Sequence, residues 1–495
     1  MYKKQEHQML LPHDFFLPFG GQLNPDNRWV KMAAMIPWWK VEEKYAKKFK
    51  SKTGKVALSV RVALGALIIQ NKCNYSDQET VNQITENPYL QYFIGLSEFQ
   101  FEAPFHSSSM THFRKRLGKN IINEVNEMIA LEATASHEED EEDNDDSTPN
   151  KENSDKKAET AETPKNKGKL LLDATCTPAD IHYPTDLGLL NKAREDLESM
   201  IDTLHVADVG KRKKPRTYRE KARKQYLSVV KQRRPRKKKI RKAIKQQLQY
   251  VRRDLGIVKD QIARHGENEL SKKQLEKLET IEKLYIQQRT MYRTKQHQVD
   301  NRIVSIDQPH VRPIVRGKAQ ANVEFGAKLS ISVVNGYAFM ETLGWENYNE
   351  GKTLIESVER YKNRFGYYPK AVLVDKIYRN RENLKYCKEK GIRMSGPRLG
   401  RPKKCEEYKQ KQIAYRDACE RNAIEGKFGE GKRVNGLGLI QARLKETSET
   451  VIALQLLVMN LQKRLRSLFA QIFLVIFREK MNLLNMLFLK SQPIQ

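Results

Sequence analysis

The stretch KLLLDATCTPADIHYP, residues 169–184, decides the fold. Three consecutive leucines, 170–172, form an apolar run that leads directly into Asp173, and Thr175 and Pro178 follow. A short apolar run bounded by polar and turn residues indicates a buried strand. The sequence therefore carries a carboxylate on an interior strand, where a charge is costly unless a cation compensates it.

Two further acidic residues lie at comparable places along the chain. The run KAVLVD, residues 370–375, is again an apolar strand that ends in an aspartate, Asp375. The last major helix, around residues 417–429, contains Glu425. Each acid alone has an ordinary explanation, because an aspartate at a strand end often caps a turn. The three together, on elements that one sheet can bring close, predict a carboxylate site for a hard divalent cation such as Mg²⁺ or Mn²⁺.

The helix that carries Glu425 also presents two cations. Arg421, Glu425 and Lys432 are spaced i, i+4 and i+11, which places all three on one face of a helix. A carboxylate flanked by cations suits a metal ion and a phosphate together. The alternative is a surface ion pair between Arg421 and Glu425, which stabilises a helix by only about 0.3–0.5 kcal/mol.

The order of the remaining elements defines the fold class. Residues 187–300 have helical periodicity with two apolar stripes, which predicts a helical hairpin. Residues 327–343 alternate with period two around Asn335-Gly336, which predicts a β-hairpin with a type I′ turn. A helix, a strand, a helix, a short strand and a final helix follow. Without the helical insertion, this order predicts an α/β fold with a mixed sheet covered by helices.

The segments before and after this core differ in composition. Residues 1–130 predict a helical N-terminal domain, in which the basic helix THFRKRLG displays Arg114 and Arg116 either to DNA or to solvent. Residues 131–168 are rich in acidic and polar side chains, so we expect a disordered acidic linker. Residues 451–495 predict apolar helices that complete the core or form a subunit interface.

The overall charge favours a polyanionic partner. The 495 residues include 91 Lys and Arg against 61 Asp and Glu, a formal net charge of +30. Residues 211–245 contain 19 of these cations and one acidic residue, and Lys237, Lys238 and Lys239 lie in their midst. Such a density of like charge is explained by DNA phosphate contact better than by a solvated surface or a targeting run.

The sequence has no pattern typical of disulfides, of a signal peptide or of a membrane span, and this indicates the cellular compartment. Its five cysteines include no C-x-x-C pair, which argues against disulfides and against a zinc site. The first residues lack the apolar stretch of a signal peptide, and the apolar run 467–477 is shorter than the ~20 residues that span a bilayer. We expect a cytoplasmic, nucleoid-associated protein with no membrane contact.

Three runs of the sequence resemble a known family. LLLDATCTPADIHYPTD, AVLVDKIYRNRENL and RNAIEGKFGEGKRVNGLGLIQARL are similar to the catalytic blocks of bacterial insertion-sequence transposases of the DDE type. One position departs from the signature, since Ala418 stands where a tyrosine usually precedes the R-x3-E-x6-K block. The resemblance implies a ribonuclease H-like core, here residues 169–186 and 301–450, interrupted by the basic insertion at 187–300.

The resemblance also implies an activity and a set of site residues. It assigns two Mg²⁺ ions, for which Mn²⁺ can substitute, to Asp173, Asp375 and Glu425, and contact with the element end to Arg421 and Lys432. Double-stranded DNA, both element ends and target, is the implied partner, with a homo-oligomer joining two ends. Cleavage and strand transfer are both in-line displacements at phosphorus that one two-metal site can perform. A nuclease of the same fold, or an inactive basic nucleic-acid-binding protein, fits the same residues.

Overall fold

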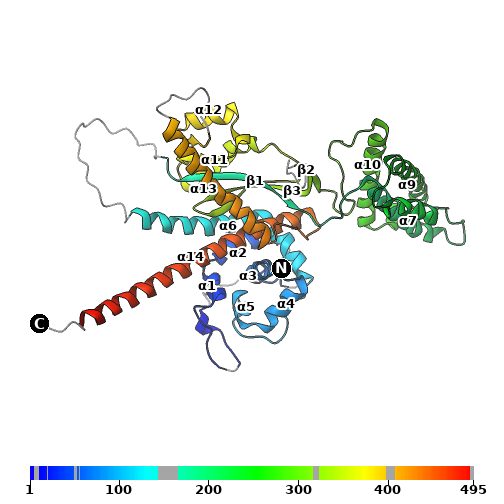
Figure 1. Ribbon diagram of the computed structural model, residues 1–495. Helices are drawn as coiled ribbons and strands as arrows, with labels where there is room; N and C mark the ends of the chain where they lie inside the picture. Colours follow the sequence, from blue (N-terminus) through cyan, green and yellow to red (C-terminus); the bar gives the residue numbers. More distant parts are fainter. Residues whose placement is uncertain are drawn as a thin grey trace.

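The computed structural model of the chain describes residues 1–4, 11–18, 20–49, 53–54, 56–142, 166–315, 323–396 and 407–490. Within these residues the architecture is a mixed α/β sheet with helices on both faces, a helical region below it and a helical lobe at one end (Figure 1). The α/β class with a mixed sheet, predicted from the sequence, is confirmed.

The sheet of the described residues has six strands. Their bounds are β1 (Lys169–Pro178), β2 (Arg312–Val315), β3 (Val323–Val334), β4 (Tyr337–Gly344), β5 (Ala371–Leu373) and β6 (Arg393–Met394). One edge of β3 pairs antiparallel with β1, and its other edge pairs antiparallel with β2 and then β4. On the far side of β1 the pairing is parallel, first with β5 and then from β5 to β6. The central strand is therefore β1, which carries Asp173.

The turn between β3 and β4 has the predicted form. Asn335 and Gly336 both have positive φ, 48° and 76°, as a type I′ turn requires. This turn matches the right-handed twist of the two strands and fixes the register from Val334↔Tyr337 onward.

Alternation along β1 and β5 sends side chains to two different helical layers. Leu170, Leu172 and Val372 belong to a core shared with α11 (Leu354–Phe365) and α12 (Arg381–Glu389). Leu171 and Leu373 belong to the opposite core, shared with α13 (Glu407–Arg433) and α14 (Lys445–Lys490). Side chains two apart on a strand share a face, so Asp173 lies on the α13 side, two residues beyond Leu171.

The N-terminal residues form helices whose core continues into the sheet. The helices are η1 (Pro12–Asp14), α1 (Arg28–Ala34), α2 (Trp38–Ala46), α3 (Val60–Cys73), α4 (Asp77–Glu86), α5 (Pro88–Phe93) and α6 (Ser109–Glu142). The buried side chains of this region, of α14 and of one sheet face make up a single cluster. The N-terminal helices thus share their core with α14 and the sheet.

Helix α6 changes direction where the sequence predicted an end. Gly118 has φ 61° and ψ 166°, outside the helical region, so the basic helix stops there and a second helical segment begins. That second segment runs to Glu142, so residues 131–142 are helical, which corrects the expectation of disorder for this part of the acidic segment. Residues 143–165 lie outside the described residues, and residues 166–168 lead into β1, where the Lys167 N–H donates to the Tyr368 carbonyl oxygen at 3.0 Å.

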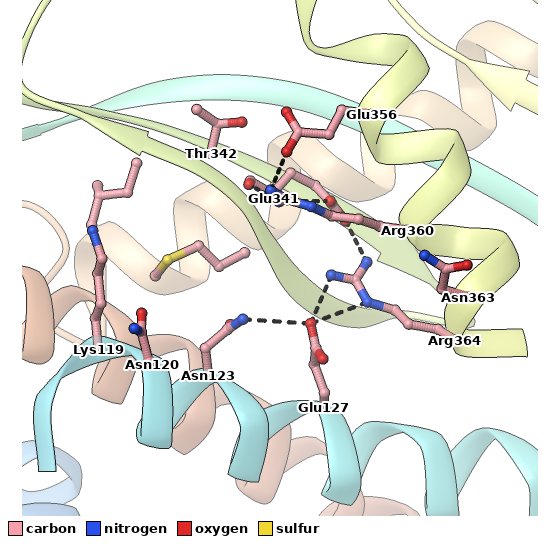
Figure 2. Close-up of a pocket in the computed structure, with 12 residues that line it drawn as sticks. Lys119, Asn120, Asn123, Glu127, Glu341, Thr342, Glu356, Arg360, Asn363 and Arg364 are labelled. Carbon is pink, nitrogen blue, oxygen red and sulfur yellow. Dashed lines mark hydrogen bonds and ion pairs between the residues drawn. The ribbon is translucent and has the colours of Figure 1, made fainter.

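An ion-pair network ties α6 to the sheet and to α11 (Figure 2). The guanidinium of Arg364 donates to the Glu127 carboxylate of α6, at 2.7 and 3.1 Å, and to the Glu341 carboxylate of β4, at 2.6 Å. Glu341 has a fully buried side chain and also accepts from the Ser332 hydroxyl at 2.6 Å. These charges are compensated within the network, and they hold α6 against the sheet.

A separate helical lobe projects from the sheet (Figure 1). It consists of α7 (Asp186–His205), η2 (Val206–Asp208), α8 (Arg219–Val230), α9 (Lys237–His265), η3 (Glu267–Glu269) and α10 (Lys272–Thr294). The apolar stripes predicted from the sequence lie on α9 and α10, and they meet α7 in a core of their own. The lobe joins the sheet through the chain on either side, after β1 and before β2.

The C-terminal region is one helix rather than several. Helix α14 runs from Lys445 to Lys490, and its first half is buried in the main core from Ile452 to Leu465. Farther on the helix leaves the body of the molecule (Figure 1), and Phe473 and Phe477 are 67% and 53% exposed. None of the described helices is both long enough and apolar enough to cross a membrane.

Candidate active site

The register between β1 and β5 places two aspartates side by side. Leu171 pairs with Leu373 across the two parallel strands. Asp173 follows two residues later on β1, and Asp375 follows two residues later on the chain that leaves β5 at Leu373, so both acids come to the same end of two neighbouring strands. Two carboxylates that are 202 positions apart in the sequence are thereby brought to one edge of the sheet.

Both aspartates line one cleft of about 580 Å³. Its other walls come from the end of β2, from β3 and from the loop after β4. The remaining lining residues are Ala174, Thr175, Cys176, Ile314, Val315, Lys328, Asn347, Tyr348, Asn349, Glu350 and Ile377. Among the described residues, the cleft is thus lined by three carboxylates, those of Asp173, Asp375 and Glu350, and by one lysine, Lys328.

Asp375 is held in its ionised form. The residue caps the short helix η5 (Lys376–Tyr378), where its carboxylate accepts from the Lys376 N–H at 2.7 Å. The Arg421 guanidinium of α13 donates to the same carboxylate at 3.0 Å. The backbone hydrogen bond and then the arginine lower the pKa of Asp375. Helix α13 thus reaches the cleft through the arginine that the sequence singled out.

Asp173 has the opposite electrostatic environment. Its carboxylate accepts one hydrogen bond, from the Ala174 N–H at 2.8 Å. Burial raises its pKa to about 6, and the negative charges of Glu350 and Asp375 add to this effect. The cleft therefore concentrates negative charge around a partly buried carboxyl group, which is the environment that a bound cation would relieve.

Glu350 is an acidic member of the cleft that the sequence did not reveal. Its carboxylate pairs with the Lys328 ammonium at 2.8 Å, and both side chains are largely buried. The short helix η4 (Glu350–Lys352) packs closely on η5. Glycine at position 351 permits this approach, because a Cβ there would stand only 2.7 Å from the Ile377 carbonyl oxygen. Nothing in the sequence around Glu350 marks it, since its position depends on this tertiary contact.

Glu425 and Lys432 lie farther along α13. Glu425 is exposed, one turn beyond Arg421, and it lines a second hollow with Gly429, Arg433 and part of α14. Lys432 is half-buried in the last turn of α13. The structure thus brings together Asp173, Asp375 and Arg421, while the Glu425 side chain lines a different hollow.

The donor set of the cleft fits a hard divalent cation in part. Asp173 and Asp375 offer carboxylate oxygens, the ligands that Mg²⁺ and Mn²⁺ prefer. Across the described ranges, no three His, Cys, Asp or Glu side chains stand close enough together to hold a metal ion. Two carboxylates are therefore in place, and a third ligand from this chain requires a side chain to move.

The predicted DNA-contacting residues of the N-terminal helices are differently placed. The Arg114 guanidinium donates to the Asp77 carboxylate, at 3.1 Å for Nη1, and to the Gln70 amide oxygen at 2.6 Å, with 13% of the side chain exposed. This residue joins α6 to α3 and α4, so its geometry is that of a packing contact rather than a displayed cation. Arg116 is exposed and lies over the Phe49 ring at 5.0 Å.

The lysines of the insertion are displayed as the sequence suggested. Lys237, Lys238 and Lys239 are all exposed in the first turn of α9, at the surface of the helical lobe. Cations at a helix N-terminus oppose the helix dipole. Their placement is therefore unfavourable for the isolated helix and leaves three positive charges available to solvent.

Comparisons with known proteins identify two regions of the chain. A family model described as "Transposase DDE domain" matches residues 372–462, the range that contains Asp375, Arg421, Glu425 and Lys432. A second, described as "Transposase domain (DUF772)", matches residues 18–116. No solved structure matches the chain.

A curated relative adds a partial match. The protein named "Uncharacterized protein ORF8 in nfe locus", from Rhizobium meliloti, is 36% identical over 103 residues. These residues are 21% of this chain and 49% of that protein, so the chain spans about half the length of this relative. One transposase domain model matches the N-terminal helices and another matches the β5-to-α14 region, so the resemblance to DDE transposases seen in the sequence is confirmed for these two regions.

Proposed function

We propose that this protein is a DNA transposase that cleaves the ends of a mobile element in a metal-dependent reaction and joins them to target DNA. One observation carries the proposal. Asp173 on β1 and Asp375, which follows the parallel strand β5, line one cleft, and Arg421, from the region similar to a transposase DDE domain, reaches Asp375.

The sheet supports a ribonuclease H-like core for this activity. Its central strand β1 carries the first carboxylate, and the parallel neighbour β5 delivers the second at its end. The helical lobe is inserted after β1, where it leaves the strand order intact. We assign residues 169–186 and 301–450 to this core.

The catalytic roles follow from the charges of the cleft. Asp173 and Asp375 would hold divalent cations, which when bound lower the pKa of water and stabilise a leaving oxygen at a phosphodiester. Arg421, which neutralises Asp375 in the structure, is placed to contact a phosphate of the element end once cations balance that carboxylate. We assign Glu425 as the third carboxylate, because it lies on the Arg421 face of α13, and Lys432 to DNA contact.

The rest of the molecule supports DNA binding by the charge it displays. The exposed lysines 237–239 supply phosphate contacts on the helical lobe. The distal half of α14 presents a stripe of exposed apolar side chains, Phe469, Phe473, Phe477 and Met481, spaced four residues apart. We assign this stripe to contact between copies of the chain, because a shared stripe suits a two-fold interface.

The proposal is tested by removing the charge of each acid without changing its shape. We expect Asp173→Asn, Asp375→Asn and Glu425→Gln each to lower Mg²⁺-dependent cleavage of element-end DNA by at least about a hundredfold, the scale of losing a metal-site ligand. DNA binding is retained in all three, because no phosphate-contacting cation is removed.

The matched control for this test is Glu420→Gln. Glu420 is on the same helix and pairs with Lys169 at 2.7 Å outside the cleft. Cleavage by this variant stays within a few-fold of the unaltered protein. Full cleavage by the Asp173→Asn or Asp375→Asn variant would refute the assigned site, and full cleavage by Glu425→Gln would remove that residue from it.

A further inference from the structure

We infer that the helical lobe contains a binding pocket for one unpaired nucleotide of DNA, with the base in an apolar slot and a phosphate at a basic rim. The inference rests on the proposed DNA-binding function and goes beyond it, because phosphate contact by exposed lysines requires no pocket. The pocket lies between the start of α9 and the end of α10, and it is remote from the aspartate cleft.

The pocket has the size of a small-molecule site. Its volume is about 370 Å³, within the range of about 300–1,000 Å³ typical of such sites. Ile240 and Ile244 of α9 and Met291 of α10 supply an apolar lining. Met291 is 5% exposed, and Ile240 and Ile244 are half-buried, so these side chains form the wall of a slot rather than an open surface patch.

A planar cationic platform forms another part of the wall. The Arg241 guanidinium lies 4.3 Å from the centroid of the Tyr292 ring and donates to the Tyr292 carbonyl oxygen at 3.1 Å. Both groups line the pocket. Aromatic rings and arginine planes are the two side-chain surfaces on which nucleobases stack, so this pair gives the slot a surface suited to a base.

The rim of the pocket is positive. Lys237, in the first turn of α9, and Lys295, just after α10 with φ 59°, are both exposed at its edge. The acidic residue of the lining, Asp186, is neutralised by Arg302 at 2.8 Å and accepts a hydrogen bond from Gln288 at 2.9 Å. The rim therefore complements an anion, and the slot beneath complements an apolar ring.

The apolar slot and the positive rim together fit an unpaired nucleotide better than they fit paired DNA. A paired base is stacked within the duplex and cannot enter a slot, whereas an extrahelical base can be taken up with its phosphate left at the surface. Lys238 and Lys239, which adjoin Lys237, are also exposed and add positive charge for the phosphates of a flanking duplex.

The experiment compares two DNA duplexes on the full-length protein. One duplex is fully paired, and the other has the same sequence with a single extrahelical adenine. We expect the bulged duplex to bind tighter by roughly five- to 150-fold, the gain from stacking one base on an aromatic side chain. This preference is a property of the unaltered protein and requires no variant to fold.

Two substitutions then assign the preference to the pocket. Ile244→Phe fills the slot and leaves every charge in place, so it should reduce the preference for bulged DNA to less than about twofold while affinity for paired DNA is unchanged. Lys242→Ala is the control, because Lys242 is an exposed cation of α9 outside the lining. It should weaken binding of both duplexes equally and keep the ratio.

The outcomes separate this inference from the proposed function. Equal affinity of the unaltered protein for the two duplexes overturns the pocket and leaves DNA binding intact. A preference that persists unchanged in a folded Ile244→Phe variant overturns this pocket as its source. Failure to bind either duplex overturns the pocket together with the proposed function.

Discussion

Asp173 and Asp375 are neighbours in the sheet, yet their surroundings act on them in opposite directions. A backbone N–H and an arginine stabilise the charged form of Asp375 and lower its pKa. Burial and two nearby carboxylates destabilise the charged form of Asp173 and raise its pKa to about 6. Paired groups with divergent pKa values are typical of functional sites. The cleft thus holds one permanent negative charge and one that depends on pH.

The first prediction concerns divalent cation binding as a function of pH. A cation binds the ionised carboxylate, so protonation of Asp173 competes with it below pH 6. Asp375 has a lowered pKa and stays ionised in the same window. We expect Mn²⁺ affinity, measured by calorimetry without DNA, to fall about tenfold between pH 7.5 and pH 5.0, because roughly one proton must be displaced at the lower pH.

The Asp173→Asn variant is the internal check on this assignment. It should bind Mn²⁺ weakly at both pH values, with the tenfold dependence gone. An affinity of the unaltered protein that is the same at pH 5.0 and pH 7.5 would show that Asp173 is not a ligand.

Of the individual residues at the cleft, the sequence identified Asp173, Asp375 and Arg421 but not Glu350. The aspartates end apolar strands, and Arg421 lies in a recognisable block, so local patterns are enough to mark them. Glu350 reaches the cleft because Gly351 permits η4 to approach η5, and that contact joins segments with no pattern of their own. The ion pair of Arg114 was not foreseen for a related reason, since its partner Asp77 lies 37 residues earlier in the chain.

A network around Arg364 joins α6, β4 and α11. This side chain is 8% exposed and links α11 to Glu341 of β4 and to Glu127 of α6 (Figure 2). A buried ion pair adds little net stability, but removing one partner leaves an uncompensated charge. The network therefore adds a charged contact to the apolar packing that holds α6 against the sheet.

The second prediction follows from that asymmetry. Arg364→Ala should lower the free energy of unfolding by about 3–5 kcal/mol, because the buried Glu341 loses its partner at 2.6 Å and keeps only Arg360 at 3.5 Å. Urea denaturation followed by circular dichroism measures the loss. Lys385→Ala removes an exposed partner of Glu389 and should cost less than about 1 kcal/mol. Similar losses for the two variants would contradict the role given to the network.

Most elements of the sheet were predictable, whereas the extents of the long helices were not. Alternation and the Asn335-Gly336 turn predicted β3 and β4, because strand period and turn chemistry are local properties. Helix α6 passes beyond Ala130 into a strongly acidic stretch, and α14 joins two apolar runs into one helix. In α14 the buried half from Ile452 to Leu465 is anchored by packing against α6 and the N-terminal helices, a tertiary effect that composition does not report.

At the scale of the whole molecule, the exposed lysines of the helical lobe and the aspartate cleft lie on different parts of the structure. The aspartate cleft lies on the sheet, and the exposed lysines 237–239 lie on the helical lobe, which has a core of its own. The lobe projects from the sheet (Figure 1). DNA that contacts both would extend from the sheet to the lobe. Its affinity would then depend on counterions released from phosphates at the lobe.

The third prediction tests that arrangement through salt. Replacing Lys237, Lys238 and Lys239 with glutamine should reduce the slope of log affinity against log salt concentration by about 2–3, since each lost phosphate contact removes about 0.9. Fluorescence anisotropy between 50 and 200 mM salt, conditions in which such slopes are resolved, gives the measurement. The same replacement at Lys385 and Lys388 of α12 and at Lys390, which follows it, should leave the slope unchanged. An unchanged slope in the first variant would place the DNA elsewhere.

The most direct test of the central claim supplies element ends already cut to a free 3′-OH and asks whether the protein joins them to target DNA in Mg²⁺. We predict joined products from the unaltered protein and from Glu420→Gln, and none from Asp375→Asn, although that variant still binds the ends. Cleavage without any joining would mark the protein as a nuclease, and joining by Asp375→Asn would contradict the aspartate cleft as the site of the reaction.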